Sequence, residues 1–342
     1  MITAAPLATP EKAAIPEPAP RWQQAWRQAL RDPVELLALL QLDPAALGVS
    51  SDALAQFPLR VPRSFVARMR AGDRNDPLLR QVLPIDREMQ VVPGFSFDAV
   101  GDGAARKATG VIQKYRGRAL LVTTGSCAIH CRYCFRRHFD YAAENASRDH
   151  WQPAMAAIAA DPDIDEVILS GGDPLSLATP KLAELTDALM RIPHLRRLRI
   201  HSRLPVVMPE RIDDELIQWL GHLPWPVAFV IHANHANEFA ADVDAALARL
   251  RNTGAQLLNQ AVLLRGVNDS VDALAALSER SFAAGVLPYY LHQLDRVQGV
   301  AHFEVGDAQA QALHAALMAR LSGYLVPRLV REIAGDSSKR PL

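Results

Sequence analysis

Short apolar runs alternate with longer amphipathic stretches along the chain from about residue 118 onward. In the longer stretches apolar residues recur every three or four positions, which predicts helices with one buried face. The short runs are rich in Val, Ile and Leu, which is typical of buried strands. The strands are expected at residues 119–123, 166–169, 198–201, 228–232, 256–262 and 286–291. The helices are expected near residues 150–160, 180–191, 210–220, 238–252, 271–284 and 307–321.

This alternation predicts an α/β fold built on a parallel sheet. Neighbouring parallel strands need a long crossover connection, which a helix usually supplies. The six strand–helix units fit a partial (β/α)6 barrel, and an open, doubly wound sheet is the structural alternative.

The first hundred residues follow a different pattern. Trp22, Trp26 and Leu30 recur with a period of four, and prolines at positions 58, 62 and 77 interrupt the later part of the segment. We therefore expect several short helices between residue 21 and about residue 83. The expected organisation is a disordered leader rich in Ala and Pro (1–20), a helical region (21–100), the barrel (101–325) and a C-terminal tail (326–342).

Composition excludes several classes of protein. The 342 residues include 37 basic and 37 acidic side chains, so the formal net charge is zero and no dense Lys/Arg block suggests nucleic-acid binding. No apolar run reaches membrane-spanning length. The N-terminus lacks the basic start and apolar stretch of a secretory signal, so we expect a cytoplasmic protein.

Polar residues follow nearly every expected strand at its C-terminal end. The clearest cases are the segments 170–173, 201–203, 232–235 and 292–295, together with Asn259 and Gln260 late in the fifth strand. In (β/α) barrels the active site is built at this face, because the loops after all the strands meet there. The recurrence predicts one shared site.

All three cysteines of the chain, Cys127, Cys131 and Cys134, fall within eight positions in a C-x3-C-x2-C pattern. Thiolates are the natural ligands of iron–sulfur clusters, and three of them leave one iron of a four-iron cluster open. A structural zinc site usually has four ligands, and His130 stands at an awkward spacing for the fourth. Zinc binding and a chance group of structural cysteines remain the alternatives.

This cysteine pattern, closed by Phe135, resembles the signature of radical S-adenosylmethionine (SAM) enzymes. The resemblance sharpens to the lysine 2,3-aminomutases over the segments 127–139, 170–175, 201–205, 259–269, 288–290 and 322–324. Among these enzymes the chain most resembles those that serve β-lysylation of elongation factor P, since it stops at Leu342 without the C-terminal segment of the longer free-lysine enzymes. The implied fold is a partial (β/α)6 radical SAM barrel with an N-terminal helical extension and a C-terminal tail that binds pyridoxal phosphate (PLP).

The resemblance also implies three cofactors and their contacts. A [4Fe-4S] cluster would be held by the three cysteines, and PLP by Lys339 as a Schiff base. The other positions that match family contacts are Tyr115, Arg118 and Gln260 for PLP and Ser170, Gly171, Gly172 and Asp173 for SAM.

The implied substrate is L-lysine, which carries charges at both ends. Arg136 matches the family's carboxylate-binding arginine, and Asp295 and Glu332 match the acidic pair that holds the ε-ammonium. The acidic pair argues against glutamate as substrate, because an unpaired buried carboxylate is unfavourable. A flavodoxin or ferredoxin would supply the electron, and the β-lysine product would be ligated to elongation factor P by a separate lysyl-transferring ligase. A free-lysine or other amino-acid aminomutase and a non-catalytic iron–sulfur protein are the alternatives.

Overall fold

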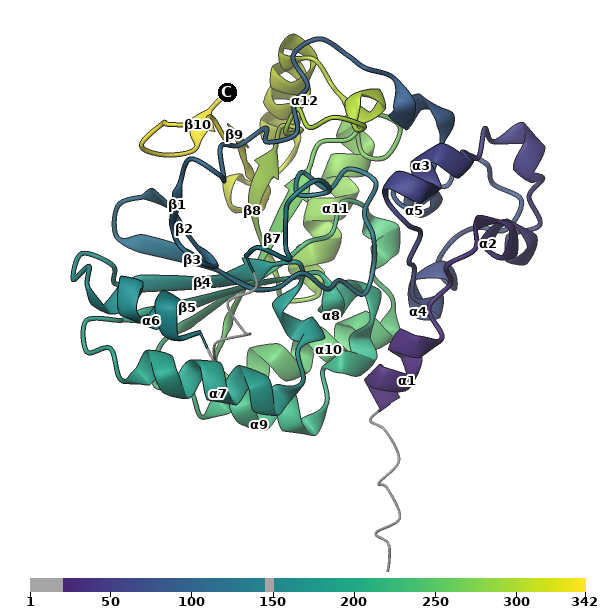
Figure 1. The fold of residues 1–342 in the computed structure, drawn as a ribbon. Coiled ribbons are helices and arrows are strands. Elements are labelled where there is room, and N and C mark those ends of the chain that lie inside the picture. Colours follow the sequence, from purple (N-terminus) through teal and green to yellow (C-terminus); the bar gives the residue numbers. More distant parts are fainter. Residues whose placement is uncertain (1–20, 145–150) are drawn as a thin grey trace, which may run out of the picture.

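The computed structural model describes residues 21–144 and 151–342 and contains a ten-stranded sheet whose strands follow one another in chain order. The predicted leader, residues 1–20, lies outside the described residues. Every neighbouring pair from β3 to β9 is parallel (Figure 1). These central strands are β3 (Arg118–Thr124), β4 (Glu166–Gly171), β5 (Arg197–Ser202), β6 (Val227–Ile231), β7 (Gln256–Val262), β8 (Leu287–His292) and β9 (Arg328–Arg331).

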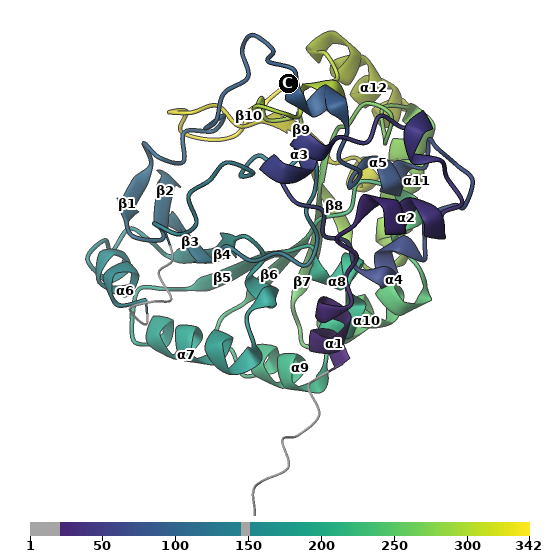
Figure 2. The ribbon, with the colours of Figure 1, turned by 45° about the vertical axis from the view of Figure 1, so that its right-hand side comes forward.

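The α/β fold expected from the sequence is confirmed. The six expected strands correspond to β3 through β8, and their ends agree to within two residues. A doubly wound sheet would reverse its strand order at one point, and this sheet never does. The sheet curves but leaves two edges, which is the partial barrel (Figure 2).

Four short strands were not anticipated. They are β1 (Arg106–Ala108) and β2 (Val111–Tyr115), which pair antiparallel and precede β3, then β9, and finally β10 (Arg340–Pro341), which pairs antiparallel with β9. Most of their residues are exposed or half-buried. A period-two pattern needs one buried face over several residues, and these strands are too short to show it.

Helices cover the outer face of the curved sheet (Figure 1). The expected helix at 210–220 begins later because the Asp213 side chain accepts a hydrogen bond from the backbone amide of Leu216 and so caps the helix start. The helix expected at 238–252 begins at Ala241, after a short 3-10 turn at Ala236–Glu238. The helices of the barrel are α6 (Gln152–Ala159), α7 (Thr179–Met190), α8 (Leu204–Val207), α9 (Asp214–Gly221), α10 (Ala241–Asn252), α11 (Val271–Ala283) and α12 (Asp307–Arg320).

The N-terminal segment forms short helices that pack on one side of the barrel (Figure 2). Proline sets two of the boundaries: Pro62 caps α4, and Pro77 is the first residue of α5. The buried Asp76 carboxylate accepts hydrogen bonds from the first two amides that follow Pro77. The helices are α1 (Arg21–Arg27), α2 (Pro33–Leu39), α3 (Ser51–Gln56), α4 (Arg63–Val66) and α5 (Pro77–Arg80), followed by a 3-10 turn, η2 (Asp86–Met89).

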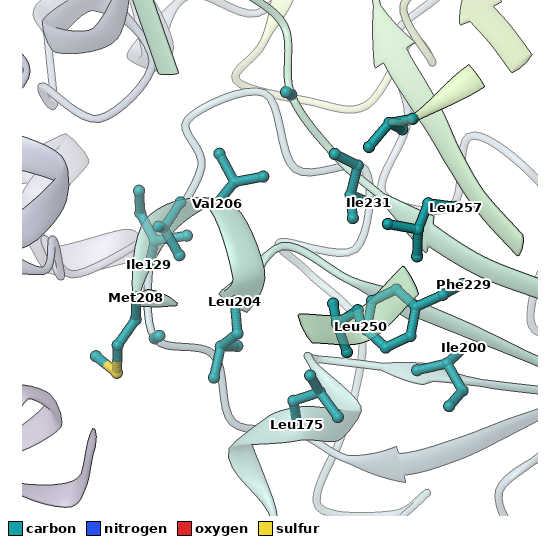
Figure 3. Packing of buried hydrophobic residues seen from close by; sticks show 14 of the residues in the cluster. Ile129, Leu175, Ile200, Leu204, Val206, Met208, Phe229, Ile231, Leu250 and Leu257 are labelled. Carbon is teal, nitrogen blue, oxygen red and sulfur yellow. The ribbon is translucent and has the colours of Figure 1, made fainter. Parts of the chain in front are cut away.

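One continuous core joins these parts. Ile200, Phe229 and Leu257 come from successive strands and pack with helix residues (Figure 3). Ile129, from the cysteine loop, belongs to the same buried cluster. The cysteine loop is therefore anchored by burial of apolar surface rather than lying free on the surface.

Candidate active site

A cavity of about 340 Å3 opens at the C-terminal ends of the parallel strands. This is the face at which barrel enzymes build their sites. Every residue that the sequence analysis assigned to a cofactor or to the substrate lines this one cavity: Cys127, Cys131, Cys134, Tyr115, Arg118, Gln260, Ser170, Gly171, Gly172, Asp173, Arg136, Asp295, Glu332 and Lys339. Residues more than 200 positions apart in sequence are thus brought together.

The cysteine loop is held by backbone hydrogen bonds to the N-terminal helical region. The amide of His130 donates to the carbonyl of Arg60 at 2.9 Å, and the amide of Arg132 donates to the carbonyl of Gln81 at 2.8 Å. All three cysteines are free thiols. Burial raises the pKa of Cys134 to about 11, so metal binding would have to displace the thiol proton.

A buried arginine lies directly against the cysteine loop. The guanidinium of Arg203 contacts the sulfur of Cys131 at 2.7 Å, and it also donates to Glu238 at 2.9 Å and to Gln81 at 2.7 Å. Arg203 follows β5, so the strand-end segment 201–203 meets the cysteines. A fixed positive charge therefore lies beside one of the three candidate cluster ligands.

A second buried ion cluster fixes the loop from the other side. The Glu88 carboxylate accepts from Arg132 at 2.5 Å and from Arg137 at 2.8 Å, and all three side chains are almost fully buried. Sequence reasoning missed this cluster, because an isolated glutamate in the N-terminal helical region carries no signal of its partner. Removing one member would leave an unpaired buried charge, so the three residues hold the loop in one position.

The two glycines at the end of β4, Gly171 and Gly172, allow two loops to touch. Gly171 has φ +112°, which favours glycine, and a Cβ added to Gly172 would lie 2.5 Å from the backbone oxygen of Ser126. The Asp173 carboxylate accepts hydrogen bonds from Ser202 Oγ and from the amide of Arg203, both at 2.7 Å. Burial raises the pKa of Asp173 to about 6, although these hydrogen bonds oppose the increase. Asp173 thus joins the loops after β4 and β5.

The C-terminal tail folds back over the cavity. Strand β9 adds to the sheet beside β8, and Lys339 follows in the connection to β10. The Lys339 ammonium pairs with Glu332 at 2.5 Å. This pairing brings the amine of Lys339 to the cavity although the tail lies at the end of the chain.

Tyr115 and Arg118 face each other across the β2–β3 turn. The Arg118 guanidinium lies 4.5 Å from the centre of the Tyr115 ring. Burial and the neighbouring Glu332 carboxylate raise the pKa of the Tyr115 hydroxyl. A phenol and a guanidinium side by side suit a ligand that accepts hydrogen bonds, such as a phosphate.

The acidic side chains differ in their ionisation. Burial, reinforced by the neighbouring Glu332 carboxylate, raises the pKa of Asp295 to about 7. Burial alone would also raise the pKa of Glu332, but Lys339 and Lys114 outweigh it and lower the value to about 2. Glu332 is therefore an ion, whereas Asp295 becomes one readily only when a cation arrives.

The described residues also include two charged side chains that the sequence analysis did not single out, the buried Asp102 and the half-buried Lys114. Asp102 pairs with Arg136 Nε at 2.7 Å and with Lys114 at 2.6 Å, and Lys114 contacts Glu332 at 3.0 Å. Asp102 stands in a loop without periodicity and Lys114 in a short strand, so neither position had a pattern that could reveal it.

Three buried histidines form the inner wall of the cavity. One histidine lies near the end of each of three strands: His201 in β5, His232 directly after β6 and His292 at the end of β8. The rings of His201 and His232 lie 5.4 Å apart. Burial lowers the pKa of His232 to about 4 and lowers that of the other two further. The wall is uncharged at neutral pH, so the charges that a ligand would meet belong to the arginine, lysine and carboxylate side chains that also line the cavity.

These residues fit the three implied cofactors. Among residues 21–144 and 151–342, no three His, Cys, Asp or Glu side chains converge tightly enough to hold a single metal ion. A four-iron cluster makes a different demand, since the three thiolates would bind three different irons rather than one shared ion. The buried, unpaired Nε2 atoms of His201 and His292 leave polar groups for bound molecules to satisfy.

Comparison with known proteins gives a consistent result. A family model described as the radical SAM superfamily matches residues 121–277. An L-lysine 2,3-aminomutase of Escherichia coli is 48% identical over 94% of this chain and 94% of its own length. The enzyme of the same name from Haemophilus influenzae is 44% identical over 94% and 97% of the two chains, and that from Clostridium subterminale is 30% identical over 93% and 77%.

Solved structures show more distant likeness. Streptococcus suis SuiB bound to S-adenosylmethionine has a TM-score of 0.47 and 13% identity, covering 64% of this chain and 51% of that one. A radical SAM methyltransferase from Sphaerobacter thermophilus has a TM-score of 0.45 and 16% identity, covering 65% and 68%. In the part of the chain that the structure describes, no helix is long and apolar enough to cross a membrane. On the strength of the full-length similarities, this chain belongs to the L-lysine 2,3-aminomutase family of the radical SAM superfamily.

Proposed function

We propose that this protein moves the amino group of L-lysine from carbon 2 to carbon 3 and so forms β-lysine. The observation that carries this proposal is the meeting, in one cavity, of three cysteines, a reachable lysine amine, one arginine and two carboxylates. When bound, the reduced cluster and SAM supply a radical that abstracts hydrogen, and PLP supplies an aldehyde that carries the migrating nitrogen.

The protein's own part is to bind, orient and enclose. Cys127, Cys131 and Cys134 would hold the cluster, and the glycine-rich segment 170–173 would approach SAM closely because it lacks bulky side chains. Lys339 would hold PLP, with Tyr115, Arg118 and Gln260 as its further contacts. The buried surroundings exclude water, which protects reactive species from side reactions.

Recognition of lysine would use charge at both ends. Arg136 is buried and presents its guanidinium to the cavity, where it would bind the α-carboxylate through paired hydrogen bonds. Asp295 and Glu332 would hold the ε-ammonium. Glutamate would place a carboxylate against these two acids, so the site should reject it.

The assay is direct. The protein, prepared without oxygen and supplied with SAM, PLP, a reductant and L-lysine, should form β-lysine, whereas L-glutamate should give no amino shift. Cys131→Ala should lose both the activity and the visible absorption of the cluster. A loaded protein that cleaves no SAM and forms no β-lysine would refute the proposal and favour a non-catalytic iron–sulfur protein.

Lys339 has its own test. Lys339→Ala should remove the PLP absorbance band that the protein otherwise shows, while Lys107→Ala, at an exposed position in β1, should keep it. If the band persists in Lys339→Ala, another lysine holds PLP.

We also propose that the β-lysine serves modification of elongation factor P, with a flavodoxin or ferredoxin as electron donor. Support for this step comes from the motif resemblance. Coexpression with elongation factor P and its lysyl-transferring ligase should add β-lysine to the factor, and the mass increase should disappear with Cys131→Ala. A factor modified equally in both cases would point to another role, such as supplying free β-lysine to metabolism.

A further inference from the structure

A continuous run of ion pairs crosses the candidate substrate site. It begins at Arg136, passes through Asp102 and Lys114, and ends at Glu332 and Lys339. The two central members, Asp102 and Lys114, have no part in the chemistry proposed above. They nevertheless connect the side chain proposed for the substrate carboxylate with one proposed for the substrate ammonium.

At the first end, Asp102 controls how Arg136 is oriented. Its Oδ2 accepts from Arg136 Nε at 2.7 Å, and Arg136 Nη1 reaches Ser170 Oγ at 3.3 Å. Both charged side chains are almost fully buried, with 6% and 3% of their surface exposed. Because Nε is held from behind, the terminal nitrogens keep a fixed direction, as a planar guanidinium cannot bend.

At the other end, Lys114 controls Glu332. Its ammonium lies 3.0 Å from Glu332 Oε1, while Glu332 Oε2 faces Lys339. The glutamate side chain can rotate about several bonds. Lys114 removes that freedom by holding one oxygen and leaving the other toward the cavity.

In the middle of the run, Asp102 and Lys114 are in close contact. The Lys114 ammonium lies 2.6 Å from Asp102 Oδ1, and Arg136 and Lys114 together overcome burial and lower the pKa of Asp102. Lys114 is mostly buried, with 16% of its side chain exposed. Charge-assisted contacts in such surroundings are short and directional.

We propose that the Asp102–Lys114 pair is a positioning element that fixes the separation of Arg136 and Glu332 and thereby selects amino acids of the length of lysine. This inference rests on the proposed function. Ornithine is one methylene shorter, so with Glu332 held in place its ammonium should fall short of Glu332 while its carboxylate stays on Arg136. Without the contact to Lys114, the Glu332 side chain would turn toward the shorter ornithine and bind its ammonium.

The test measures binding rather than turnover. PLP-loaded protein, without SAM or reductant, is titrated with L-lysine or L-ornithine while the PLP absorbance is followed. The wild-type protein should prefer lysine by at least about tenfold, in the range that one methylene gives. Lys114→Met should weaken lysine binding about tenfold, as expected for loss of a charged hydrogen bond, and should reduce the preference to about threefold or less.

Matched variants separate positioning from general damage. Lys114→Arg keeps a donor in reach of both carboxylates and should recover most of the preference. Lys107→Met, on the neighbouring strand β1 but exposed, should behave as wild type. Asp102→Asn keeps the shape of the residue without its charge and should also lose the preference for lysine, which gives a second measurement if Lys114→Met fails to fold.

The outcomes are distinct. If Lys114→Met and Asp102→Asn weaken lysine and ornithine equally, or leave the wild-type ratio unchanged, the pair does not set substrate length and the inference is wrong. If the wild-type protein binds PLP but its absorbance does not respond to lysine, the proposed function itself fails.

Discussion

Replacing Asp295 with asparagine should stabilise the cofactor-free protein at pH 8 although it removes a proposed ligand of the substrate. Asp295 lies in the cavity next to Glu332, and burial and this neighbour raise its pKa from 3.8 to about 7. The folded protein therefore resists ionisation of this carboxyl group. Asparagine has nearly the same shape and no charge to bury.

The magnitude follows from the pKa. A carboxyl whose pKa rises from 3.8 to about 7 on folding reduces the free energy of unfolding by about 4 kcal/mol once the pH exceeds both values. Asp295 keeps partial exposure, so water screens part of this, and we expect a gain of about 2 kcal/mol for the variant at pH 8. Because folding raises the pKa of this acid, its ionisation destabilises the folded protein, and the free energy of unfolding falls as the pH rises from about 4 to about 7.

Urea unfolding of cofactor-free protein at pH 5 and pH 8 measures the effect. The gain from Asp295→Asn should be largest at pH 8 and should shrink at pH 5, with an unchanged denaturant slope. Asp187→Asn, at an exposed position in α7, should change stability little at either pH. A variant no more stable than wild type at pH 8, or a gain independent of pH, would refute the reasoning.

Three further predictions follow from the site. Lysine binding to the PLP-loaded protein should weaken as the pH falls below about 7, by up to tenfold per pH unit. The reason is that Asp295, with its pKa of about 7, becomes protonated and no longer attracts the substrate ammonium. Titration with lysine at several pH values checks this, and an affinity that does not change with pH contradicts it. Glu88→Gln should destabilise the protein by about 3 kcal/mol in urea unfolding, because it leaves Arg132 and Arg137 buried with a neutral partner. An unchanged urea midpoint would show that the Glu88 charge does not stabilise the fold. Gly172→Ala should weaken SAM binding in equilibrium dialysis, because the added Cβ would lie 2.5 Å from the Ser126 oxygen. A Cβ at Gly306 meets nothing within 4 Å, so Gly306→Ala should bind SAM normally. Equal SAM binding by the two variants would show that the close approach of Gly172 to Ser126 is not needed.

The parts of the fold that the sequence predicts are those with repeated local patterns. The strands β3, β4 and β6 have buried apolar runs, β5 and β7 alternate buried and more exposed residues, and the intervening helices have a regular apolar face. The cysteine triplet identifies its own chemistry, because so few arrangements of three thiols serve another purpose. The face of the barrel that holds the site could also be expected from the polar residues after each strand.

The remaining features depend on contacts between distant residues. Lys339 has no local pattern that marks it, and only the resemblance to a family suggested its role. Asp102, Lys114 and Glu88 are ordinary charged residues in the sequence, and their partners lie 12 to 218 positions away. Such residues determine the arrangement of the site only because they are buried with their partners. The spacing of apolar residues along the sequence does not reveal which polar residues are buried.

The anchoring of the cysteine loop affects how the metal centre can be assembled. Glu88 holds Arg132 and Arg137 within the same loop as the three thiols, and Ile129 is buried in the core. A loop fixed in this way loses little conformational entropy when iron and sulfide arrive, since the backbone is already ordered. Loss of the cluster to oxygen should thus leave the cysteine loop in its folded conformation, so that iron and sulfide can reassemble the cluster without refolding of the protein.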